Sequence, residues 1–217
     1  TSYYGPSVMC EFAENYEIHD YTKKYVEEVL FRNSENITIT SSPKWTSEFL
    51  DWSNEAYDSQ KRKMHHEKHG YEVLQGKGNF EGELLGGCID VFPMFIGTKI
   101  WPSINDWENK ILFLETSEDE VPPDYIEYYL RNLIAQGIID KINGIIIGKP
   151  QNEKYYEEYK EVYKNVIGGE ANRPELPILY NVNIGHTAPM CIFPFGQKIR
   201  VDLNKKEIIF LEKPMSE

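Results

Sequence analysis

The sequence predicts an α/β fold whose mixed sheet carries an antiparallel addition, and three observations indicate it. Short apolar runs alternate with helical patterns through the second half of the chain, as is typical of parallel strands joined by right-handed crossovers. Prolines precede the helical pattern at 122–137 and Gly137 ends it, as at many helix boundaries. The tail holds two alternating patterns around the turn LNKKE, which predicts an antiparallel strand pair.

The first half of the chain is less regular. TSYYGPSVMCEF is interpreted as a strand that runs into a turn, and residues 20–32 carry apolar side chains at helical spacing behind Asp20, a candidate N-cap. ENITITSSP alternates like a short strand that stops at Pro43. Residues 44–70, here named the excursion segment, are polar with poor periodicity and are expected to form short helices and loops over the surface.

From residue 71 onward the pattern is more ordered. The run to residue 90 contains four glycines that permit tight turns or close backbone approach, and it is expected to form a hairpin or a barrel corner. The remaining expected elements are a strand at 111–115, a helix at 122–137, a strand at 143–150, a helix at 153–169 closed by Gly168, a strand at 176–186 and the two tail strands at 190–212.

The length and the charge of the chain limit the classes of function that it can have. The 217 residues suffice for one large domain or a domain and a half. The formal net charge of −12 opposes binding to nucleic acid. No stretch approaches the roughly 18 uninterrupted apolar residues of a membrane span, and the first residues lack a signal-peptide pattern, so we expect a soluble, cytoplasmic protein.

Cysteine and histidine spacing gives no metal or disulfide signal. Cys10, Cys88 and Cys191 are an odd number without a CxxC pair, so reduced buried thiols are expected. His65, His66 and His69 have spacings that could place ligands on one helical face, but their very polar setting favours a solvated helix end. We therefore expect no metal and no cofactor.

Two titratable residues end apolar strands, at the edge where open α/β sheets collect ligands: Glu115 after ILFL and His186 after NVNIG. A half-buried carboxylate could orient an imidazole, as in a nucleophilic triad, although a helix-cap acid and a structural histidine are the competing interpretations. The third member is not evident. Ser7 is followed by an apolar run and not by a turn that would expose its hydroxyl, and Cys88 in GGCID is more consistent with a small core residue.

Several ordered blocks carry a more specific signal: GPSVMCEFAE, LQGKGNFEGELLGGCIDVFPMFIGTKIWP, KILFLETSED, GIIIGKP and NVNIGHTAPMCIFPFGQKIRVDL. Together they resemble the LD-carboxypeptidase family of serine peptidases, within it the microcin C immunity branch. The resemblance implies an N-terminal α/β domain with a nucleophilic Ser in a Gly-x-Ser-Asp turn and a C-terminal swivelling β/β/α domain that supplies Glu and His. It assigns these two roles to Glu115 and His186.

The Gly-x-Ser-Asp turn is absent from the sequence. The resemblance therefore implies that residues 1–35 are the last elements of the nucleophile domain and that residues 36–217 are the C-terminal domain. We expect the chain alone to be inactive without that missing domain. The resemblance also implies a homodimer.

Family substrates are the L,D-peptide bond of murein tetrapeptides or peptidyl and aminoacyl nucleotides, whose base stacks on an aromatic side chain. Trp45 and Trp52 of the excursion segment are the candidates for that stacking, and both could instead anchor the segment onto the core. Residues 86–88 are GGC, where many relatives have GGN. We expect this difference at Cys88 to affect the fine substrate preference. The alternatives from other classes are a non-catalytic binding module and, ranked last, a glycosidase that uses Glu115 and Glu118.

Overall fold

The computed structural model describes residues 2–32 and 34–215. An eight-stranded mixed sheet organises them in the order β2-β12-β11-β6-β7-β8-β9-β5. The strands are β2 (Thr38–Ile39), β5 (Glu72–Gln75), β6 (Asn79–Cys88), β7 (Ile111–Glu115), β8 (Gly144–Gly148), β9 (Ile178–Val182), β11 (Lys198–Asp202) and β12 (Glu207–Phe210). The predicted α/β class with a mixed sheet is confirmed.

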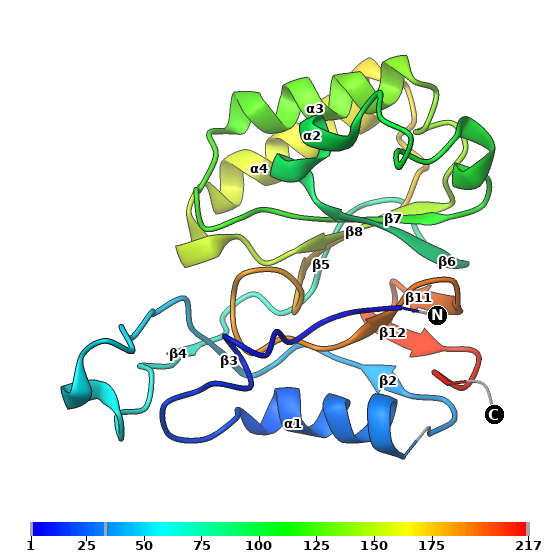
Figure 1. The fold of residues 1–217 in the computed structure, drawn as a ribbon. Helices are drawn as coiled ribbons and strands as arrows, with labels where there is room; N and C mark the ends of the chain where they lie inside the picture. Colours follow the sequence, from blue (N-terminus) through cyan, green and yellow to red (C-terminus); the bar gives the residue numbers. More distant parts are fainter. Residues whose placement is uncertain (1, 33, 216–217) are drawn as a thin grey trace.

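Strands β6 to β9 pair in parallel, and the predicted crossover helices join them. Helix α3 (Pro123–Ala135) follows β7, and α4 (Tyr156–Tyr163) with the π-helical turn η6 (Lys164–Glu170) follows β8. Both helices cover one face of this part of the sheet (Figure 1). The expected stop at Gly168 is wrong, because the π-helical turn continues through both glycines.

Two hydrophobic cores lie on opposite faces of the parallel strands. Along β7, Leu112 and Leu114 pack into the core beneath the helices, whereas Ile111 and Phe113 pack into the other core. This alternation follows from the two-residue period of a strand. By the same two-residue period, Glu115 lies on the same side of the strand as Ile111 and Phe113. All five residues of β7 are buried, so the carboxylate ends the strand in a buried position.

The second core is closed by the antiparallel part of the sheet and by the N-terminal helix. Strands β11 and β12 form the predicted hairpin. Helix α1 (Asp20–Val26) and the π-helical turn η1 (Glu27–Phe31) pack Tyr25, Val26 and Val29 into the same core, below β2 and β12 in Figure 1. The helix at 20–32 is confirmed, but His19 takes the N-cap position and makes no side-chain cap.

Of the two alternatives expected for residues 71–90, a hairpin or a barrel corner, the hairpin is wrong. Strand β5 lies at the edge of the sheet, antiparallel to β9, whereas β6 pairs with β11 through its first half and with β7 through its second. β6 therefore joins the antiparallel and parallel parts of the sheet. Gly86 allows the close approach, since a Cβ there would lie 1.9 Å from the Phe113 carbonyl oxygen.

The excursion segment is mostly irregular and extends to one side of the molecule (Figure 1). It contains β3 (Lys44–Trp45), a 3₁₀ turn η2 (Glu55–Tyr57) and β4 (His65–His66), and β3 pairs with β4. The predicted helix end at the histidines is wrong, because His65 and His66 lie in this short strand. Among the described residues, no cluster of His, Cys, Asp or Glu could hold a metal ion.

The remaining short elements connect these parts. They are β1 (Tyr3–Tyr4), η3 (Ile89–Val91), α2 (Phe92–Phe95), η4 (Ile104–Trp107), η5 (Gln151–Glu153) and β10 (Phe193–Pro194). β1 pairs antiparallel with β10, and a turn follows, as predicted. None of the helices in the described ranges has the length and apolar character needed to cross a membrane.

Candidate active site

Glu115 and His186 lie together where the parallel strands end. Glu115 Oε2 lies 2.8 Å from His186 Nδ1. The Glu115 side chain is fully buried, and the His186 side chain is 38% exposed. Although the two residues are 71 positions apart in sequence, the fold brings them into direct contact in the orientation that a Glu–His proton-transfer pair requires.

Two glycines make room for the pair. A Cβ on Gly185 would lie 2.7 Å from Glu115 Oε2, and Gly185 has φ +98°. A Cβ on Gly148, at the end of β8, would lie 2.9 Å from Glu115 Cβ. Glycine is therefore required at both positions, because a Cβ at Gly185 would displace the carboxylate and a Cβ at Gly148 would displace the stem of the Glu115 side chain.

Hydrogen bonds hold the loop that carries His186. Asn183 Oδ1 accepts from Ser42 N, and Asn183 Nδ2 donates to the Pro189 carbonyl. Thr46 and Ala188 exchange backbone hydrogen bonds of 2.7 and 2.9 Å. The histidine loop is thus attached to the excursion segment as well as to the sheet.

The second imidazole nitrogen faces another carboxylate. His186 Nε2 lies 3.1 Å from Oε2 of the exposed Glu118. An imidazole that meets carboxylate oxygens at both nitrogens donates from both, so this geometry favours the imidazolium form. The hydrogen bond to Glu115 raises the pKa of His186, with further contributions from the negative charges of Glu118 and Asp90, and these effects outweigh the opposing desolvation.

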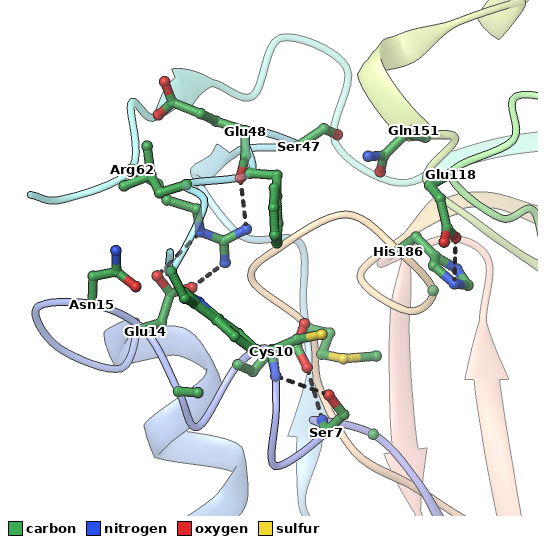
Figure 2. A pocket seen from close by; sticks show the side chains of 18 of the residues that line it. Ser7, Cys10, Glu14, Asn15, Ser47, Glu48, Arg62, Glu118, Gln151 and His186 are labelled. Carbon is green, nitrogen blue, oxygen red and sulfur yellow. Dashed lines mark hydrogen bonds and ion pairs between the residues drawn. The ribbon is translucent and has the colours of Figure 1, made fainter. Parts of the chain in front are cut away.

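A cavity of about 560 Å³ opens in front of His186. Three parts of the chain form its walls, and Figure 2 shows most of their side chains. The N-terminal segment contributes Tyr4, Gly5, Ser7, Cys10, Glu11, Ala13, Glu14 and Asn15, the excursion segment contributes Ser47, Glu48, Phe49, Leu50, Trp52 and Arg62, and the sheet edge contributes Glu118, Gln151, Gly185, His186 and Met190.

The two tryptophans predicted as candidate stacking residues have different environments. Trp52 lines the cavity, is 44% exposed and lies 6.3 Å from the ring of Phe49. Trp45 is 7% exposed, stacks on His65 at 4.8 Å and lies under the Lys149 ammonium at 4.4 Å. Trp45 is therefore a packing residue in this structure, and Trp52 is available to a ligand.

No described serine hydroxyl is bonded to His186. Ser7 Oγ accepts from Cys10 N at 3.1 Å, and Ser47 Oγ accepts from Asn152 N at 3.0 Å. Figure 2 shows Ser7 and Ser47 on separate walls of the cavity, apart from His186. Contrary to expectation, a turn follows Ser7 and Ser7 is exposed, but neither hydroxyl is placed to lose its proton to this histidine.

The cysteines are free, as predicted, but only Cys191 is buried; Cys88 is half-buried and Cys10 is exposed. Burial and the charges of Glu115 and Asp90 raise the pKa of Cys88 to about 12. The Cys88 thiol therefore stays protonated at neutral pH and is a poor nucleophile.

Sequence reasoning missed the residue that contacts the Glu–His pair from the N-terminal segment, Tyr4. Its hydroxyl donates to Glu115 Oε1 at 2.7 Å. A tyrosine near the start of the chain, 111 positions from the carboxylate, carries no local signal of such a contact. Only the pairing of β1 with β10 brings it there.

Comparison with known proteins assigns the family. The model of the LD-carboxypeptidase C-terminal domain matches residues 81–201, a range that contains both Glu115 and His186. The chain is 27% identical over 216 residues to the microcin C7 self-immunity protein MccF of Escherichia coli, which covers 99% of this chain and 60% of that protein.

Solved structures agree. The crystal structure of an MccF-like protein from Streptococcus pneumoniae in complex with AMP has a TM-score of 0.85 and 33% identity over 96% of this chain and 62% of that one. MccF in complex with aspartyl sulfamoyl adenosine has a TM-score of 0.78 and 26% identity over 99% of this chain and 62% of that one. The chain spans about 60% of the length of these relatives. It belongs to the LD-carboxypeptidase family and is MccF-like in fold.

Proposed function

We propose that this chain supplies the Glu–His pair of a serine-type carboxypeptidase. The observation that carries the proposal is the contact of buried Glu115 with His186 Nδ1, at the wall of a cavity of substrate size where Nε2 faces the exposed side chain of Glu118. Once Glu118 turns away and the imidazolium gives its Nε2 proton to solvent, the neutral Nε2 takes the proton of a serine hydroxyl as that oxygen attacks an amide carbonyl. It then returns the proton to the leaving amine, and water hydrolyses the acyl-enzyme in the same way.

In this proposal the nucleophile is a Gly-x-Ser-Asp serine outside residues 1–217. Support comes from the hydroxyls of Ser7 and Ser47, which hydrogen-bond to other groups and not to His186, and from the protonated thiol of Cys88. Residues 1–35 are then the last elements of the nucleophile domain and residues 36–217 the C-terminal domain. The chain alone is expected to be inactive, since Glu115 and His186 without a nucleophile only weakly polarise water.

The proposed substrate is an aminoacyl or peptidyl nucleotide, and a murein L,D-tetrapeptide is the alternative. Relatives of similar fold hold AMP or aspartyl sulfamoyl adenosine. In this chain, Trp52 is the proposed stacking residue because it lines the cavity, whereas Trp45 is covered. Stacking of one base on an aromatic ring contributes about 1–3 kcal/mol. The resemblance also supports a homodimer, which sedimentation of the purified chain tests.

The test uses two proteins: this chain, and a version extended upstream to include any Gly-x-Ser-Asp turn. Each is incubated with an aminoacyl nucleotide and with a murein L,D-tetrapeptide, and products are followed by mass spectrometry. We expect cleavage only by the extended protein. His186→Ala should abolish it, whereas His66→Ala, which removes an exposed histidine of the excursion segment, should not. Cleavage by the short chain would place the nucleophile inside it and refute the assignment.

A binding module is the second candidate, favoured by the contact between Glu118 and His186 Nε2 in this structure. It predicts that the extended protein binds an aminoacyl nucleotide without turnover. Wild-type cleavage by the extended His186→Ala variant would reject the proposed peptidase mechanism.

A further inference from the structure

Tyr4 contacts the Glu–His pair from an element that lies far from it in sequence. Its hydroxyl donates to Glu115 Oε1 at 2.7 Å, while Glu115 Oε2 faces His186 Nδ1 at 2.8 Å. The tyrosine ring packs edge-on against Phe113 at 4.9 Å and against Phe195 at 6.5 Å. The ring is thus fixed by core residues, and its hydroxyl points at the carboxylate.

The buried carboxylate depends on this donor. The Glu115 side chain has no exposed surface, and the backbone at Gly148 and Gly185 packs directly against it. Tyr4 and His186 supply one donor to each of its two oxygens. A buried carboxylate that loses a donor is destabilised, because water does not replace the lost hydrogen bond.

The hydroxyl remains a donor at any physiological pH. Burial raises the pKa of Tyr4 well above its ordinary value, and the negative charge of Glu115 raises it further. The other titratable groups around the pair are Glu118 at His186 Nε2, Asp90 on η3, Cys88 opposite Glu115 on β6, and Glu11 near Tyr4. Of these groups, the neutral Cys88 thiol also hydrogen-bonds to Glu115, and the Tyr4 hydroxyl donates to Oε1 at 2.7 Å.

We propose that Tyr4 is a positioning residue for the reaction: its hydroxyl holds Glu115 Oε1, so that Oε2 stays directed at His186 Nδ1. The proposal rests on the proposed role of the Glu–His pair in proton transfer. It adds an electrostatic role for the hydroxyl. The hydroxyl dipole stabilises the lone carboxylate, left when His186 is neutral, more than it stabilises the carboxylate–imidazolium pair. Tyr4 therefore keeps His186 available as a base nearer to neutral pH.

The test is an NMR titration of the His186 ring in the 217-residue chain, which needs no turnover. Tyr4→Phe keeps the aromatic packing and removes only the hydroxyl. We expect the measured pKa of His186 to rise by about half a unit, the scale of one modest hydrogen bond. Tyr3→Phe is the matched control, because the Tyr3 hydroxyl donates to the Pro214 carbonyl at the same 2.7 Å and does not contact Glu115.

A double-mutant cycle shows whether the Tyr4 hydroxyl acts on His186 through the Glu115 carboxylate. In a Glu115→Gln background, Tyr4→Phe should leave the pKa of His186 unchanged, because the charge that the hydroxyl moderates is gone. An unchanged or lowered pKa in Tyr4→Phe alone, or an equal rise in the Glu115→Gln background, overturns the proposal. Failure of the peptidase mechanism is a separate result, since it is measured as cleavage by the extended protein.

Discussion

The parallel strands and the excursion segment both reach the cavity, but they differ in how they are built. The five residues of β7 and the five of β8 are all buried. The excursion segment has two two-residue strands and one 3₁₀ turn. The strands and their connections place Glu115 and His186, whereas the excursion segment contributes Trp52 and Arg62. Glu115 thus lies on a central strand and His186 on a short loop hydrogen-bonded to its surroundings, whereas the proposed recognition surface lies on the longer, irregular excursion segment.

A buried lysine joins the two regions. Lys149 follows β8, and its ammonium donates to Glu67 in the excursion segment at 3.0 Å, to Glu153 at 2.7 Å and to Asn181 at 3.2 Å. The Lys149 side chain is 1% exposed and that of Glu67 is 6% exposed. This ion pair therefore attaches the loop wall of the cavity to the sheet.

Breaking that attachment is the largest effect we predict. Lys149→Met leaves the Glu67 carboxylate buried without its cation, which should lower the free energy of unfolding by about 3–5 kcal/mol. Urea unfolding measures the loss, and limited proteolysis should cut first within the excursion segment. The control is Lys164→Met, which removes an exposed ion pair with Glu161 and should cost less than about 1 kcal/mol. Equal losses in the two variants would show that Lys149 does not join the regions.

Two glycines extend the comparison to the histidine loop and the excursion segment. Gly185→Ala introduces a Cβ 2.7 Å from Glu115 Oε2 at φ +98°, whereas Gly70→Ala, in the excursion segment, adds a Cβ at φ +63° with no atom within 4 Å. We expect losses of about 3 kcal/mol at Gly185 and about 1 kcal/mol at Gly70, where only backbone strain contributes. Thermal unfolding of the two variants measures the difference. Similar losses would mean that the histidine loop yields as easily as the excursion segment.

The smallest predicted effect concerns Glu118 and pH. Because Glu118 helps to raise the pKa of His186, Glu118→Gln should lower that pKa by about half a unit, the scale of an exposed ion pair. A raised folded-state pKa stabilises the protein at pH values below the unfolded pKa, and this gain disappears as pH rises through the folded pKa. The variant should therefore lose a little stability at pH 5.5 and none at pH 9.

NMR titration of His186 and unfolding at the two pH values measure these changes. Asp119→Asn is the matched control, since it removes an equal charge from the neighbouring exposed position. If Asp119→Asn shifts the pKa of His186 as much as Glu118→Gln does, general charge and not the Nε2 contact is responsible.

Local pattern was sufficient for the elements that bury all their residues. ILFLE and GIIIG could only be central strands, and the proline and glycine at the ends of α3 marked its limits. The pattern was insufficient between residues 44 and 90. The polar run around His65 forms a strand because β3 pairs with it, and the glycine-rich run after β5 is the central strand β6 and not the return of a hairpin. Pairing partners distant in sequence decide both cases, and local propensity does not contain them.

The sequence by itself determined the α/β class, the parallel strands and the candidacy of Glu115 and His186, because strand periodicity and strand-end position are local properties. Only the tertiary structure decided which side chains meet. It brought Tyr4 to Glu115, placed Glu118 at His186 Nε2, buried Trp45 and left Trp52 on the cavity. These contacts join residues on separate elements, and their geometry depends on how the sheet curls and how the loops pack, which no local pattern encodes.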